Sequence, residues 1–190
     1  AESARRIIPS FNSQNLANTS WSFSKLGFFH TPLLAALAEA ALARISEGDG
    51  QHLANIAWSF ATLMWHHTPL RKSISAQSLR RIGDFGSQNI GNLSWAFARL
   101  HFLDPPLLAS ISAAALARIG EYRSQELANI SWSFATLLVC DNPLMPAIAA
   151  AARRNIAAFE SQSLVNTAWA YAKLTVCDWP LMSATSAQSI

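Results

Sequence analysis

Arginine side chains recur at one position of the chain with a constant spacing. Arg44, Arg81 and Arg118 are 37 residues apart, and Arg80 and Arg154 lie one residue before the same position in their units. A guanidinium group binds phosphate through several donors, so these five residues are candidates for contacts with a nucleic-acid backbone. A structural role is the alternative, because a cation near the C-terminus of a helix interacts favourably with the helix dipole and the last carbonyls. The spacing is compatible with both roles.

Five aromatic side chains form a second candidate set, because they are expected in loops, where a partner protein can reach them. They are Phe28, Phe29, Trp65, Phe102 and Trp179. Large aromatic side chains supply much of the binding energy of protein interfaces. The alternative is that the rings fold over the adjacent turns and only stabilise the chain. The set therefore indicates either contacts with a protein complex or local packing.

Histidine and aspartate share another position in successive units, at His30, His67, Asp104, Asp141 and Asp178. A metal ion needs several ligands within about 2 Å of one point. Equivalent residues of stacked helices lie about 8–10 Å apart, because that is the distance between packed helix axes. We therefore predict no metal site at this position.

Neither the cysteines nor any familiar enzyme motif points to catalysis. Cys140 and Cys177 occupy equivalent positions, so we expect their Cα atoms to lie beyond the limit of about 7 Å for a disulfide and both thiols to be free. The sequence contains no glycine-rich phosphate loop, nucleophile elbow or paired carboxylates at catalytic spacing. We predict a protein that is not an enzyme, with no cofactor and no small-molecule substrate.

The spacing of 37 residues extends through the entire chain. Five positions of the unit are nearly constant in residue type, without insertion or deletion, and such periodicity is typical of helical-repeat proteins. The repeated positions are Gln14, Gln51, Gln88, Gln125 and Gln162; Asn18, Asn55, Asn92, Asn129 and Asn166; Trp21, Trp58, Trp95, Trp132 and Trp169; Phe23, Phe60, Phe97, Phe134 and Tyr171; and Pro32, Pro69, Pro106, Pro143 and Pro180.

Each unit is predicted to contain two helices. The first begins near Ser13 and ends near Leu26, and the second has Pro32 at its first helical position and ends near Ile45. The predicted caps of the first helix are Ser13, Ser87, Ser124 and Ser161, with Gly50 as a substitute, and those of the second are Thr31, Thr68 and Asn142.

The predicted fold class is an all-α solenoid of stacked helical hairpins. A single array covers residues 1–190, in units of about 9–45, 46–82, 83–119, 120–156 and 157–190. Glu2 aligns with Glu39, so the chain is expected to begin within a second helix, and Ser189 and Ile190 are expected to end within another. We therefore expect an excerpt of a longer array, or one with ends that partners cover.

The repeated polar and aromatic positions are interpreted mainly as structural. The tryptophans lie opposite Leu16 and Phe23 on the first helix and are expected to pack between repeats, since no unit of a solenoid buries its surface alone. The asparagines could contact bases, but hydrogen bonds to neighbouring backbone are the favoured reading. The glutamines are expected to cap helices or to join repeats. The outward positions of the second helix are mostly Ala and Ser, which suits contact with another protein better than recognition of base edges.

The composition excludes several classes of protein. The chain has 190 residues, of which 51% are hydrophobic and 13% charged, with a net charge of +3, so it is not disordered and attracts nucleic acid only weakly over long range. The uncharged, largely apolar stretch 53–70 contains Asn55 and Pro69, so we expect no membrane insertion. No targeting segment is recognisable.

Segments 124–135 and 161–170, with the sequences SQELANISWSFA and SQSLVNTAWA, carry the clearest copies of the repeated motif. Together with the following proline-started helix they resemble the octotricopeptide repeat, and about five such units cover the whole chain. The resemblance implies an organellar α-solenoid, in chloroplast or mitochondrion, that binds single-stranded RNA and acts in RNA maturation, stability or translation. The alternative is a protein-binding scaffold or assembly subunit of a large organellar complex.

Overall fold

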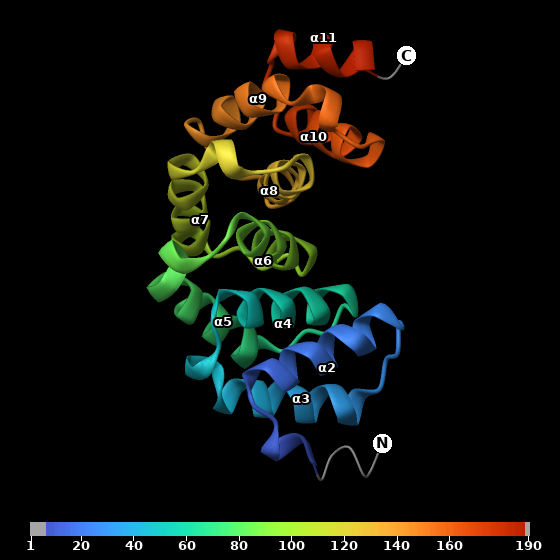
Figure 1. Cartoon of the computed structure of the whole chain (residues 1–190), viewed down its shortest axis with the longest axis vertical. Helices are drawn as coiled ribbons and strands as arrows, with labels where there is room; N and C mark the ends of the chain where they lie inside the picture. The colour runs from blue at the N-terminus through green and yellow to red at the C-terminus, as the bar shows by residue number, and fades with distance from the viewer. Residues whose placement is uncertain (1–6, 189–190) are drawn as a thin grey trace.

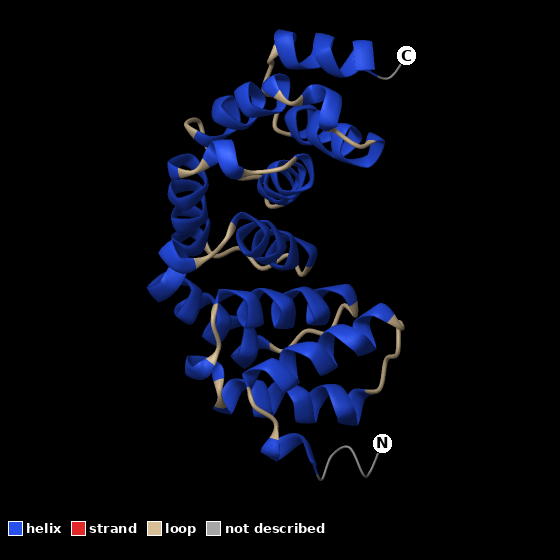
Figure 2. Ribbon diagram, in the orientation of Figure 1, coloured by secondary structure: helices blue, strands red, loops and turns tan. Residues whose placement is uncertain are grey.

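The computed structural model describes residues 7–188, which form ten α-helices and five short 3-10 helices, without a β-strand in this range. Figure 2 shows that short loops join the helices. Glu2, Ser189 and Ile190 lie outside the described residues. The α-helices are α2 (Ser13–Lys25), α3 (Thr31–Ala43), α4 (Gly50–Thr62), α5 (Thr68–Arg81), α6 (Ser87–Arg99), α7 (Pro105–Ala117), α8 (Ser124–Thr136), α9 (Leu144–Arg154), α10 (Ser161–Lys173) and α11 (Trp179–Gln188).

The helices are stacked in two rows, as the 37-residue period predicts. We call α2, α4, α6, α8 and α10 the inner helices, and α3, α5, α7, α9 and α11 the outer helices. Successive inner helices pack against one another much more closely than successive outer helices do. The array therefore curves, and Figure 1 shows an arc with the inner helices on its open side. The predicted all-α solenoid is confirmed.

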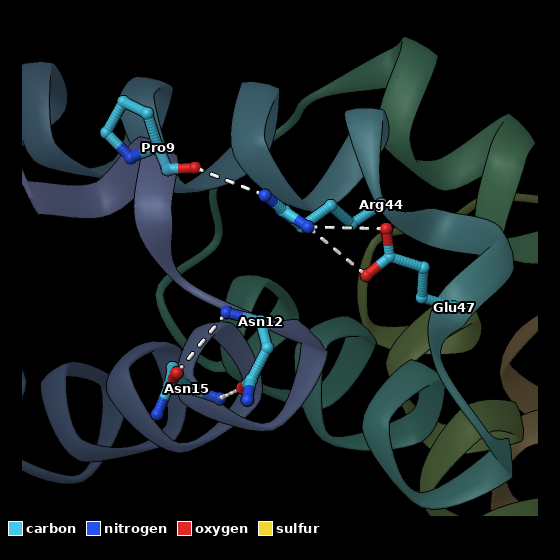
Figure 3. Close-up of polar contacts among 5 residues, drawn as sticks. All are labelled: Pro9, Asn12, Asn15, Arg44 and Glu47. Atoms are coloured by element: carbon cyan, nitrogen blue, oxygen red, sulfur yellow. Dashed lines mark hydrogen bonds and ion pairs between the residues drawn. The ribbon is translucent and has the colours of Figure 1, made fainter.

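The helix caps differ from the prediction by one position. Ser13 is the first helical residue of α2, and the cap is Asn12, whose side chain accepts a hydrogen bond from the Asn15 amide at 2.8 Å (Figure 3). Asp49 caps α4 in the same way through the amide of His52. The predicted serine caps were wrong because the residue before each serine already has the extended backbone of a cap.

The outer helices are capped by the column of histidine and aspartate residues. The His67 imidazole accepts a hydrogen bond from the Leu70 amide, and the Asp104 carboxylate accepts one from the Leu107 amide. Thr31 and Thr68 are therefore first helical residues rather than caps, Pro32 is the second, and Asn142 is not a cap either. The complete set of capping side chains is His30, His67, Asp104, Asp141 and Asp178.

Each inner helix ends in the same left-handed turn. Gly27 has a φ of +61°, and its equivalents Met64, His101, Leu138 and Thr175 have φ values between 50° and 57°. The next amide donates to the carbonyl five residues earlier, as Phe28 does to Phe23 at 3.0 Å. This is the Schellman motif, in which the residue after the left-handed position also packs against the last helical turn.

A continuous hydrophobic core runs through the stack from Ile8 to Leu181. Phe97, Phe134 and Tyr171 lie in it at equivalent positions, and the Tyr171 hydroxyl donates to the Met145 carbonyl at 2.5 Å. Burial raises the pKa of Tyr171, and it raises the pKa of Tyr122 to about 12, against the opposing effect of Arg118. Within the described part of the chain, the Tyr122 oxygen has no hydrogen-bond partner.

Candidate nucleic-acid interface

The inner helices present one repeated set of side chains on the same helical face. From the N-terminal end of each helix, the set consists of a glutamine, an asparagine four residues later, a tryptophan three residues after that, and a final residue another four on. Residues at these spacings lie on one side of an α-helix. The last position holds Lys25, Thr62, Arg99, Thr136 and Lys173. We call this surface the inner face.

The tryptophans of the inner face form a continuous column across the repeats. The ring centroids are 6.0 Å apart for Trp58 and Trp95, 6.4 Å for Trp95 and Trp132, and 6.3 Å for Trp132 and Trp169. The predicted contact between repeats is therefore present. The indoles are not fully buried by this contact: Trp21 is 44% exposed and Trp169 43% exposed, and the other three are partly exposed. Neighbouring indoles meet with their planes tilted by 28–31°, and Trp95 also packs against the core.

A lysine completes the tryptophan column at its N-terminal end. The Lys25 ammonium lies 5.5 Å from the ring centroid of Trp21 and 5.1 Å from that of Trp58. A cation at this distance from an indole is attracted by the electrons of the ring. Lys25 thus connects the first indole to the second, whereas the later indoles contact each other directly.

The amide side chains of the inner face are available for hydrogen bonding. All five glutamines are exposed, Asn18 is exposed, and the other four asparagines are partly exposed. Among residues 7–188, none of these ten side chains hydrogen-bonds another side chain or the backbone. The favoured interpretation of the asparagines, a hydrogen bond to neighbouring backbone, was therefore wrong, and the glutamines do not cap the helices. The other interpretation of the glutamines, a contact between repeats, stays a prediction.

The charges on the inner face are all positive. Arg99 and Lys173 are exposed, and neither forms an ion pair with a described residue. Of the residues in the five inner helices, Glu126 is the single acid, and its carboxylate accepts a hydrogen bond from the backbone amide of Arg123 at the start of α8. Nothing within the described inner helices neutralises the cations beside the indoles.

The centre of the inner face is hollowed. An open depression of about 480 Å³ lies over the middle of the array. It is lined by indoles, by amides, by the cation Arg99 and by Thr62, which takes the place of the cation in the second unit. The lining residues are Trp58, Thr62, Trp95, Arg99, Trp132, Gln162 and Asn166.

The predicted arginines lie on the other side of the molecule, at the ends of the outer helices. The Arg44 guanidinium pairs with Glu47 at 3.3 Å and reaches the Pro9 carbonyl at 3.4 Å (Figure 3). Arg81 donates to the Gly48 carbonyl at 2.7 Å, and Arg118 donates to the Phe85 carbonyl. All three guanidinium groups thus bind a carbonyl near the start of their own unit, just before its inner helix.

Arg80 and Arg154 differ from the three arginines above, because both are exposed and neither has a polar partner among residues 7–188. They lie in the last turns of α5 and α9. Contact of any of the five arginines with a nucleic acid stays a prediction.

Comparison with protein families identifies the kind of solenoid. A model of the RNA-editing substrate-binding complex 6 protein family (RESC6) matches residues 1–114 and, in a second overlapping stretch, residues 45–190. The chain belongs to the RESC6 family. The two overlapping stretches are what an array of similar repeats produces, since different units can align with the same part of a model. Comparison with curated proteins found none with significant similarity.

The loop aromatics of this RESC6-family chain are mostly packed against the fold. Phe28 lies 5.5 Å from Phe23, and Phe102 lies 5.5 Å from Phe97, as the turn motif requires. Trp65 contacts Phe29 at 5.8 Å and is partly buried. Phe28 and Phe29 remain about half exposed, at 48% and 54%, and Trp179 is 78% exposed.

The side chains that could bind a metal are dispersed in the described part of this RESC6-family chain. Within residues 7–188 no three His, Cys, Asp or Glu side chains are close enough to hold a metal ion together. Cys140 and Cys177 are free and exposed, as predicted. In the same range, each helix is too short or too polar to cross a bilayer.

Proposed function

We propose that the chain is a single-stranded-RNA-binding solenoid of an RNA-editing substrate-binding complex, and that it binds RNA without catalysing a reaction. Membership of the RESC6 family supports the assignment to an RNA-editing substrate-binding complex. The observation that carries RNA binding is the inner face, where a column of partly exposed indoles lies between free amides and unpaired cations. The resemblance to octotricopeptide repeats points to the same class of ligand.

The three kinds of side chain on the inner face match the three parts of a nucleotide. Bases stack on aromatic rings, with a gain of about 1–3 kcal/mol per base. Amide groups both donate and accept hydrogen bonds, as the edges of bases do. Lysine and arginine neutralise phosphates. A duplex hides its bases, so this combination suits a single strand.

The test compares cations on the two sides of the molecule. One variant combines Lys25→Gln, Arg99→Gln and Lys173→Gln on the inner face. The matched control combines Lys72→Gln, Arg80→Gln and Arg154→Gln, which removes three exposed cations from the outer helices and therefore the same net charge. Binding of a labelled single-stranded RNA of about 12 nucleotides is followed by fluorescence anisotropy at several salt concentrations.

We expect the slope of log K against log salt to fall by about 2 for the inner variant, at about 0.7 per phosphate, and to stay unchanged for the control. The reverse result would transfer the RNA site to the outer helices and support Arg80 and Arg154. Absence of binding at low salt by the folded wild-type chain would overturn the proposed function.

A protein-binding role is the second candidate, because the ring of Trp179 is 78% exposed and the outer helices present small side chains such as Ala113 and Ala117 to solvent. Such a surface lets another helix approach closely. Cross-linking of the complex, with Trp179→Ala as the test variant, distinguishes this role from RNA binding. The organellar location is also a proposal, which imaging of the tagged full-length protein tests.

A further inference from the structure

The inner face repeats the same side chains in every unit. The glutamine, the asparagine and the tryptophan are identical in all five repeats. A solenoid that reads one base per repeat does so with side chains that differ between repeats, because each base presents its own pattern of donors and acceptors. Five identical amide pairs offer the same pattern to each nucleotide. This surface therefore has no means of reading a different base in each repeat.

The contacts among the indoles remove a second source of selectivity. Aromatic rings in direct contact have centroids about 4.5–7 Å apart, and the three measured pairs are 6.0–6.4 Å apart. No slot for a base exists between neighbouring rings. The bases must instead lie against the exposed part of the tryptophan column. Every position along this column offers a base the same aromatic surface.

The order of the side chains along each helix fixes the orientation of a bound strand. At a rise of about 1.5 Å per residue, the cation lies about 6 Å beyond the tryptophan toward the hairpin turn, and the asparagine lies about 4.5 Å before it. The same order in five stacked helices produces parallel rows of cations, indoles and amides. A strand that crosses the helices can place its phosphates on the cations, its bases on the indoles and its base edges toward the amides.

The row of cations is interrupted in alternate repeats. Lys25, Arg99 and Lys173 belong to the first, third and fifth units, and threonine takes their place in the second and fourth. The Thr62 hydroxyl donates to the Trp58 carbonyl at 2.9 Å, and the Thr136 hydroxyl is buried. Phosphate contacts are therefore few and widely spaced, and stacking on the indoles must provide much of the affinity.

We propose that the inner face is a sequence-independent track for single-stranded RNA, on which the strand crosses the inner helices with its phosphates toward the hairpin turns. This inference rests on the proposed function and deepens it. The track holds exposed bases by stacking and leaves their identity to be read by pairing with another strand or by another protein.

The test measures the affinity for several 12-nucleotide RNAs that differ in sequence and form no structure: oligo-U, oligo-C and two mixed sequences. A 12-base-pair RNA duplex is measured beside them. We expect dissociation constants within about fivefold of one another for the single strands, and binding at least tenfold weaker for the duplex. A preference of more than tenfold for one single strand, or equal binding of the duplex, would overturn the track. Failure of every RNA to bind would instead overturn the proposed function.

A second variant tests the amide rows separately from folding. Asn55→Ala, Asn92→Ala and Asn129→Ala are combined, and circular dichroism confirms the helical fold. Because these side chains have no partner within the described residues, the thermal midpoint should change little. The affinity should fall by the same factor for every single strand. A loss confined to one sequence would show that the asparagines read bases and would contradict the track.

Discussion

The inner and outer helices both carry a column of cations, which occur in alternate units of the inner row and in successive units at Arg44, Arg81 and Arg118 of the outer row. The two columns have different surroundings. Arg81 and Arg118 of the outer column donate to the carbonyls of Gly48 and Phe85, near the start of their own units. Arg99 and Lys173 of the inner column have no polar partner among the described residues and lie next to exposed indoles. The repeat thus uses one cation to tie the end of its outer helix to the start of the same unit, and leaves the other cation without a polar partner among the described residues.

The same contrast holds for the aromatic side chains. Phe97 and Phe134 of the inner helices point into the core and are almost completely buried, whereas Trp95 and Trp132 lie on the inner face. A folded solenoid needs the first pair for its stability. Trp95 and Trp132 are partly exposed, so they add less to folding than the buried phenylalanines do, because part of their apolar surface stays in water. The exposed part of this column is the surface that the proposed binding uses.

The largest expected effect comes from removal of the central indoles. Trp95→Leu combined with Trp132→Leu keeps apolar volume but removes two stacking surfaces, so RNA affinity should fall about 30-fold or more, at about 1 kcal/mol or more per base. Trp179→Leu, which removes an exposed indole outside the inner face, is the control and should leave anisotropy titrations unchanged. Equal losses of RNA affinity in the two variants would contradict the assignment of RNA binding to the inner face.

A smaller effect, on stability, is expected at the two kinds of arginine. Arg118→Gln removes a charged donor from the Phe85 carbonyl and should lower the free energy of unfolding by about 1.5–3 kcal/mol. Arg99→Gln should change it by less than about 0.5 kcal/mol, because an exposed side chain without partners contributes little. Urea denaturation of both variants measures the difference. If Arg99→Gln proves the more destabilising, the assignment of the two columns is reversed.

The smallest effect is expected at Tyr122, which lies in the turn before α8. Phenylalanine occupies the equivalent positions 85 and 159, and the buried Tyr122 oxygen has no partner among the described residues, so Tyr122→Phe should stabilise the fold by about 1 kcal/mol. Tyr171→Phe, which deletes a hydroxyl bound to the Met145 carbonyl, should lower stability instead. Thermal melts at neutral pH compare the two.

The raised pKa of Tyr122 adds a pH dependence to this prediction. Burial favours the neutral phenol, so the folded-state pKa of about 12 lies above the ordinary value of 10.0. The associated stability is present below about pH 10 and is lost as the pH rises toward 12. The loss of unfolding free energy between these values should be smaller in Tyr122→Phe than in the wild type. An identical loss in both proteins would assign alkaline unfolding to other groups.

The repeat itself made the fold predictable. A constant period with proline near the start of one helix and a polar residue near the start of the other was enough for the hairpins and their stacking. The caps were misplaced by one residue, since serine is common both as a cap and as a first helical residue, and the sequence alone does not show which residue has an extended backbone. His30 and Asp104 were recognised as one column, but their role as caps became clear only from their contacts with Leu33 and Leu107.

The candidate site was only partly predictable. Tryptophan is usually buried, so the column was assigned to the space between repeats, and the amides beside it were assigned to structural hydrogen bonds. The sequence did contain a usable pattern: Gln88, Asn92, Trp95 and Arg99 are spaced so that all four share one helical face. What it could not reveal was that this face lies on the open side of the arc. That depends on the closer packing of the inner helices.

The unequal packing of the two rows also determines how the array can deform. The inner helices are held together along their length by the core and by touching indoles, whereas successive outer helices have fewer contacts. In mechanical terms, the inner row is the stiff side of a curved beam and the outer row is the compliant side. Changes in curvature should therefore spread or close the outer helices while the length of the tryptophan column stays nearly constant. We therefore expect the curvature of the array to change while the spacing between neighbouring tryptophans stays constant.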